Sequence, residues 1–200
     1  MVLPDSPGDV VVTPNGADTA LARGFVIGDG IENLSDMAQR VRFIVTPYTV
    51  DDNGDTRCIG ENGTAVVWVN PTPVMSVSIP DTIVCDSATI TITVNDDNGA
   101  VAADKVYDLT INNPGGVTGV EPPGEYVAGT DIINQLINPT NAVQTVTYTF
   151  RPQLTDPRNA GALFCDNGKD TSITVYVNPT PVMSVSIPDT IVCDSATITI

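Results

Sequence analysis

Four cysteines are the residues of this sequence with the clearest capacity for covalent chemistry. Cys85 and Cys193 occupy the same place in two identical strings, and Cys58 and Cys165 each lie in a loop that precedes a later apolar stretch. An even number of cysteines at repeated positions favours disulfides in an oxidising compartment. A zinc site would be expected to show a CxxC spacing or histidines, and the chain has neither. The sequence therefore predicts disulfide bonds and, with them, a secreted, extracellular or cell-surface location.

Acidic turns are the second group of residues that could do chemistry, at 51–55, 95–99 and 165–170. The first contains Asp51, Asp52 and Asp55, and carboxylate oxygens of this kind bind Ca²⁺ in extracellular modules. The closing Glu of an EF-hand loop is missing. The same residue types also form ordinary β-turns, because Asp, Asn and Gly tolerate left-handed backbone conformations. Calcium at Asp51, Asp52 and Asp55 is therefore the one candidate cofactor, and plain turns are the alternative.

Composition argues against catalysis and against nucleic-acid binding. The chain has no histidine, which removes the commonest general base and the commonest metal ligand. With 8 Lys and Arg against 24 Asp and Glu, the formal net charge is −16, so the surface repels phosphate backbones and anionic lipid headgroups. No apolar run reaches the roughly 18 residues of a membrane-spanning helix. We expect a protein that is not an enzyme, with no nucleic-acid partner and no membrane insertion in this segment.

A repeat organises the whole chain. The string VNPTPVMSVSIPDTIVCDSATITI occupies 69–92 and recurs without a change at 177–200, which is 108 residues later. A divergent pair also aligns, RVRFIVTP at 40–47 with TVTYTFRP at 145–152. A spacing of this size matches one immunoglobulin-like domain with a short linker. The repeat therefore predicts a tandem array.

The repeat divides the chain into three parts. Residues 1–70 are expected to be the C-terminal part of one repeat that lacks its first two strands, 71–180 a complete repeat, and 181–200 the first two strands of a further repeat. Because the sequence stops within an expected strand, we expect either a window of a longer array or a subunit whose ends complete a neighbour's domain. Prolines in the linkers restrict the backbone and hold neighbouring domains at a set angle. The linker residues are Asn70, Pro71, Pro73, Asn178, Pro179 and Pro181.

Period-2 alternation predicts the strands of the complete repeat. Apolar residues alternate with serines at 75–79 and with threonines at 88–94, so each strand has one apolar face. Seven strands in about 100 residues predict a two-sheet antiparallel sandwich. The predicted fold class is all-β, with tandem immunoglobulin-like β-sandwich domains. The further strands are expected near 105–112, 116–120 and 131–137, followed by a last hairpin of 143–151 with 171–178.

Several strings also carry a family resemblance. These are ATITITV at 88–94, INQLINPTNAVQTVTYTFRP at 133–152, Cys165, and TSITVYVNPTP at 171–181. Together they resemble the PKD-like domains found in tandem in giant surface proteins of gliding, Bacteroidetes-type bacteria. One departure is the Asp-Ser that follows Cys85, where family members often have Ser-Gly. The resemblance covers the complete repeat and part of both flanks. It implies an extracellular immunoglobulin-like fold, type IX export of the parent protein, a role in adhesion or surface filaments, and no enzymatic activity.

The connectivity of the cysteines has three alternatives. Pairing Cys85 with Cys165 would place the bond within one domain. In a sandwich, however, the turn before the second strand and the loop before the last strand lie at opposite ends. Those two ends meet between neighbours in a head-to-tail array, so a bond between neighbouring domains is our first expectation. The bond within one domain and free thiols are the other two.

The function that we expect is a load-bearing spacer, a structural repeat unit of an extracellular filament, stalk or giant adhesin. Its partners would be neighbouring repeats of the same protein, within a homo-oligomer or filament. Strands at 182–200 could complete the half-domain at 1–70 of the next subunit by strand exchange. The alternative is an adhesin module that binds a cell-surface partner or glycan through its loops, and calcium could rigidify either. The exact repetition of one string favours the spacer, because spacer units are near-identical between copies whereas adhesive units carry distinctive loops.

Overall fold

The computed structural model describes residues 2–4, 8–13, 21, 26, 30–159, 162–187 and 190–198. All regular elements in this part of the chain are strands, which confirms the predicted all-β fold. No helix among these residues is long and apolar enough to cross a membrane.

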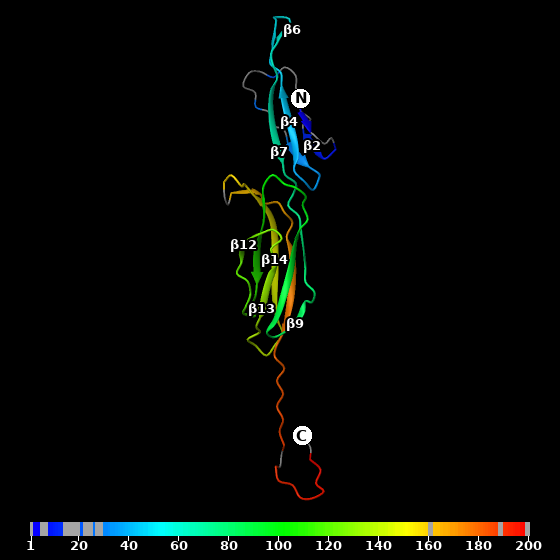
Figure 1. The fold of residues 1–200 in the computed structure, drawn as a ribbon, viewed down its shortest axis with the longest axis vertical. Helices are drawn as coiled ribbons and strands as arrows, with labels where there is room; N and C mark the ends of the chain where they lie inside the picture. The colour runs from blue at the N-terminus through cyan, green and yellow to red at the C-terminus, as the bar shows by residue number, and fades with distance from the viewer. Residues whose placement is uncertain are drawn as a thin grey trace.

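Residues 75–178 form two sheets, which we call the central sandwich (Figure 1). One sheet has the order β13-β10-β8, and the other has the order β12-β11-β14-β16-β9, with β15 also paired to β14. All of these pairs are antiparallel except β9 with β16. The strands are β8 (Met75–Ser78), β9 (Ile83–Cys85), β10 (Ala88–Asp96), β11 (Asp104–Asn112), β12 (Gly124–Val127), β13 (Ile132–Leu136), β14 (Gln144–Thr155), β15 (Leu163–Cys165) and β16 (Thr171–Asn178).

The core of the central sandwich lies between its two sheets. Alternate residues of β10, β11, β13, β14 and β16 are buried and join one hydrophobic cluster, as the period-2 pattern predicts. The cluster also encloses one polar contact, because the Tyr148 hydroxyl donates to Asn134 Oδ1 at 2.7 Å and both residues are buried. Burial raises the pKa of Tyr148 above its ordinary value. The core is therefore apolar, with its buried amide satisfied.

The predicted strands agree with the structure except at 116–120, and the short strands β9 and β15 were not predicted. The last hairpin is confirmed, since β14 pairs with β16 from Gln144↔Val177 to Phe150↔Thr171. The expected strand at 116–120 is wrong: only Thr118 forms a bridge there. Glycines 116 and 119, with φ of 66° and 77°, interrupt the extended backbone in this stretch. The unexpected β12 instead pairs with β11 at the sheet edge.

The N-terminal part of the chain forms three smaller sheets at one end of the molecule (Figure 1). The first has the order β1-β4-β7, the second pairs β2 with β3, and the third pairs β5 with β6 in a hairpin that projects from the far end. The chain after β16 extends away from the opposite end of the sandwich. The strands are β1 (Val2–Pro4), β2 (Val10–Thr13), β3 (Gly30–Asn33), β4 (Gln39–Val45), β5 (Tyr48–Val50), β6 (Thr56–Ile59) and β7 (Gly63–Val69).

Candidate functional site

The hairpins β4–β7 and β14–β16 have the same register. Gln39 is opposite Val69 in the first, and Gln144 is opposite Val177 in the second. These are the residues that the sequence repeat aligns. The two hairpins thus share local geometry as well as sequence.

An asparagine network closes the base of the β14–β16 hairpin. Asn138 Nδ2 donates to the carbonyl oxygens of Val177, at 2.9 Å, and Ala142, at 2.8 Å. Its Oδ1 accepts from the backbone N and the hydroxyl of Thr140, both at 2.9 Å. Gln144 Nε2 donates to the same hydroxyl at 2.9 Å. One buried amide therefore ties the loop before β14 to the end of β16.

The same network recurs at the base of β4–β7. Asn33 Nδ2 donates to the carbonyl oxygens of Val69 and Met37, both at 2.8 Å, and its Oδ1 accepts from Ser35 N and Oγ at 3.0 and 2.8 Å. Gln39 Nε2 donates to Ser35 Oγ at 2.9 Å. This hydrogen-bond network was not predicted from the sequence. The signal that would have found it is the Asn-x-Ser/Thr-x₃-Gln pattern shared by 33–39 and 138–144.

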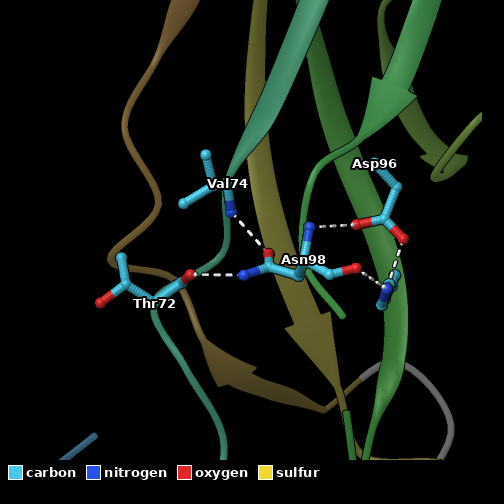
Figure 2. Close-up of polar contacts among 5 residues, drawn as sticks. Thr72, Val74, Asp96 and Asn98 are labelled. Carbon is cyan, nitrogen blue, oxygen red and sulfur yellow. Dashed lines mark hydrogen bonds and ion pairs between the residues drawn. The ribbon is translucent and has the colours of Figure 1, made fainter. Parts of the chain in front are cut away.

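A side-chain clamp fastens the linker to the central sandwich (Figure 2). Asn98 Nδ2 donates to the Thr72 carbonyl oxygen at 3.1 Å, and Asn98 Oδ1 accepts from Val74 N at 2.7 Å. Asp96 accepts from Asn98 N at 3.2 Å, and Lys105, which forms an ion pair with Asp96, donates to the Asn98 carbonyl at 2.8 Å. Asp96 and Lys105 therefore fix the turn that carries Asn98.

The loop that carries Asn98 also contacts the N-terminal part directly. Gly99 N donates to the Asp36 carbonyl at 2.8 Å, and Ala38 N donates to the Ala100 carbonyl at 2.7 Å. Residues 36–38, 70–74 and 97–102 together make a site that we call the junction. The strands on its two sides are thus joined by hydrogen bonds as well as by the chain.

The junction buries one of the two linkers. Pro71 and Pro73 are buried, whereas the matching Pro179 is half-buried and Pro181 is exposed. The sequences of the two linkers are identical. The linker prolines are therefore both buried at 71–73, where folded strands lie on both sides of the linker, and not in the identical linker at 179–181.

Asn70 begins the junction and has an incomplete set of hydrogen bonds. Its Oδ1 accepts from Ala102 N at 2.7 Å. Its Nδ2 is buried and has no hydrogen-bond partner among the described residues. The matching Asn178 differs, because its Nδ2 donates to the Val84 carbonyl of β9 at 3.2 Å. A buried donor without a partner is costly, which marks Asn70 as an unusual position.

Cys85 and Cys165 lie at opposite ends of the central sandwich. Cys85 is opposite Asn178, beside the start of β14, and Cys165 is opposite Leu154, near the end of β14. At about 3.3 Å per residue, the step along β14 from Gln144 to Leu154 spans roughly 33 Å. A disulfide needs Cα atoms within about 7 Å. The geometry is therefore incompatible with a bond between these two residues in one folded chain.

The remaining cysteines are accessible. Cys58 is exposed in the β5–β6 hairpin, opposite Thr49, and Cys193 is exposed in the segment after β16. All four cysteines are free thiols in this structure. Burial, and next the charge of Asp166, raises the pKa of the Cys165 thiol. The disulfides stay a prediction.

The acidic turn at 51–55 closes through its own hydrogen bonds. Asp51 Oδ1 accepts from Asn53 N at 3.0 Å and from Asp55 N at 2.9 Å, and Arg57 forms an ion pair with Oδ2. The bond from Asp55, more than the others, lowers the pKa of Asp51. Among the described residues no three His, Cys, Asp or Glu side chains are placed to share a metal ion, those of Asp52 and Asp55 included. Calcium binding here stays a prediction.

Comparison with known proteins leaves the chain without an assigned family. No family model matches it, and no curated protein matches it.

Proposed function

We propose that this chain is a load-bearing structural repeat of an extracellular cell-surface filament, stalk or giant adhesin, made of tandem immunoglobulin-like domains of the PKD-like kind. The observation that carries the proposal is the parallel pairing of β9 with β16, in the register Tyr176↔Ile83, Val177↔Val84 and Asn178↔Cys85. These strands lie near the two ends of the central sandwich in sequence, where a filament would apply tension.

Parallel pairing of terminal strands resists tension because of its direction. Tension would pull the linker before β8 away from the linker after β16, so β9 and β16 would slide past one another. The hydrogen bonds between them, such as Tyr176 N to the Thr82 carbonyl at 2.7 Å, lie across the pull and share the load. Thr180 Oγ1 adds a bond to Asp86 at 2.6 Å beyond the ladder.

The junction gives the proposal further support. Contacts between neighbouring units stiffen a spacer, and the 97–102 loop binds both the linker and residues 36–38. The shared hairpin register and asparagine network support the tandem organisation. With no histidine in the sequence, we assign the chain no catalytic role.

Single-molecule force spectroscopy on the whole chain, pulled from its two ends, tests the proposal. Val84→Pro removes an N–H from the β9 edge, so we expect a lower unfolding force. Ile83→Thr is the matched control: its side chain is exposed and the variant keeps its N–H, so its unfolding force should stay native. An unchanged unfolding force in Val84→Pro would exclude β9–β16 as the load-bearing pair.

The second candidate function is an adhesin module, and one observation favours it. The β5–β6 hairpin projects from the end of the molecule and exposes Val50 and Ile59 (Figure 1). Glycan-array and cell-binding assays with the full chain separate the two functions. Binding that is lost in Ile59→Ser would support the adhesin, and no binding would favour the spacer. Protease treatment of intact producing cells tests the extracellular location.

A further inference from the structure

The β4–β7 hairpin exposes part of an apolar face that its counterpart buries, although Val41, opposite Val67 on this face, is itself 0% exposed. Val45 is 53% exposed and Val67 is 41% exposed. The residues at the matching positions of β14 and β16 are Phe150 and Val175, and both are 0% exposed. The difference therefore comes from what lies over the face, because the register of the two hairpins is the same.

In the central sandwich this face is covered by the sheet that contains β8 and β10. Met75 of β8 and Ile90 of β10 are buried in the shared core. Residues 73–92, which form β8, β9 and the first part of β10, have the same sequence as 181–200. In that second copy the matching Met183 is 86% exposed and Ile198 is 51% exposed. The chain thus contains both a partly uncovered face and an unused copy of the strands that cover such a face.

Asn70 has a buried donor to which the docked strand would offer a partner. Its buried Nδ2 has no partner among the described residues, whereas Nδ2 of the matching Asn178 donates to the Val84 carbonyl of β9. The residue that matches Val84 in the second copy is Val192. A strand placed beside β7 as β9 lies beside β16 would bring the Val192 carbonyl to Asn70 Nδ2. Docking would thus offer a partner to a donor that is buried and unpaired among the described residues.

The second copy already has the turn that the covering strands need. Ser195 has a φ of 66°, and the matching Ser87 has a φ of 65°. In the central sandwich, Asp86 in this turn accepts from Asn138 N at 2.8 Å and from Thr180. Because left-handed φ is unfavourable for serine, a turn that is already formed lowers the cost of docking.

Resting on the proposed filament function, we propose that residues 182–200 of a second copy of this chain dock on the β1-β4-β7 sheet, cover its apolar face and so join copies head to tail. The register follows from β9–β16 and sets Ile191 opposite Trp68, Val192 opposite Val69 and Cys193 opposite Asn70. The segment of the same chain is excluded because it extends from the opposite end of the molecule (Figure 1).

Sedimentation of the full chain, with two complementary variants, tests the docking. Val67→Asp places a charge on the docking face, and Met183→Asp places one on the docking segment. Each loses the burial of one apolar side chain, so each should weaken self-association about a hundredfold or more. An equimolar mixture should form a dimer and nothing larger, because only one productive interface remains. Native chain should form a concentration-dependent series of oligomers.

Ser186→Asp is the matched control for the docking segment. It corresponds to the exposed Ser78, so it should assemble like the native chain. Met183 lies outside every strand, so its substitution leaves the folded sheets intact. Native chain that stays monomeric at all concentrations, or a mixture of the two variants that stays monomeric, would overturn the docking. The pulling experiment reads unfolding within one chain, so its outcome is independent of assembly.

Discussion

Asn98 is predicted to hold the junction closed. Asn98→Ala removes two hydrogen bonds to the linker, one to the Thr72 carbonyl and one from Val74 N. Backbone bonds from Gly99 and Ala38 would still cross the junction, and Asp97 N and Ala102 N would still bind the linker, but the turn would lose its two side-chain bonds to the linker. We therefore expect the junction to open more often, while the sheets on both sides stay folded.

The size of the effect follows from these two bonds. A hydrogen bond contributes a net free energy of about 1 kcal/mol, and both bonds lie where water can replace the lost partner, so no large desolvation penalty is added. The closed junction should therefore lose about 2 kcal/mol relative to the open one. At 1.4 kcal/mol per factor of ten, the ratio of open to closed junction should rise about 30-fold.

Amide hydrogen exchange measures this opening at single residues. The amides of Ala38 and Gly99 donate across the junction, so their exchange should accelerate about 30-fold in Asn98→Ala. Amides within β14 should keep their native rates. Asp97→Ala is the control, because the one side-chain bond of Asp97 among the described residues is to Ser76, at 3.2 Å, and not to the linker. Native exchange at Ala38 and Gly99 in Asn98→Ala would refute the reasoning.

Three further predictions concern the central sandwich. Tyr148→Phe leaves a buried amide oxygen without its 2.7 Å donor, so urea unfolding should show a loss of about 1–3 kcal/mol, and native stability would contradict this role. The Thr180 hydroxyl, before other contacts, lowers the pKa of Asp86 below 3.8. The stability that this carboxylate contributes is present above its unfolded pKa and is lost as pH falls through its folded pKa. In a plot of the urea midpoint against pH, Asp86→Asn should therefore show a smaller fall at acid pH than the native chain. An equal fall in both proteins would argue against this role. A non-reducing peptide map after treatment with oxidised glutathione, which accepts the two electrons of each thiol pair, should show no bond between Cys85 and Cys165, and finding that peptide would disprove their separation.

Local pattern was enough to predict the longer strands of the central sandwich, but not the short strands β9, β12 and β15. Ile90, Ile92 and Val94 alternate with polar residues and are all buried, because successive side chains of a strand point to opposite faces. The pairing of β14 with β16 was also predictable, since both strands are long and regular. A single internal repeat located the linkers. Composition and periodicity therefore determined the fold class.

The errors lie where local pattern is weak. Residues 116–120 contain Gly116 and Gly119 among Val and Thr, and the glycine conformations prevent a continuous strand there. The short strand β12 has no alternation strong enough to separate it from the surrounding loop; its pairing with β11 decides its structure. Asn33 and Asn138 have a shared spacing in sequence, but their carbonyl partners on β7 and β16 are more than thirty residues away.

The sequence by itself determined an acidic, all-β chain with an exact repeat, because alternation, charge and identity are properties of neighbouring residues. Only the tertiary structure decided which copies of the repeat are packed. Pro73 is buried and Pro181 is exposed, although both stand in the same string, and Met75 and Met183 differ in the same way. Burial depends on what other segments lie against a residue. One identical stretch of chain can therefore be core in one place and an open edge in another.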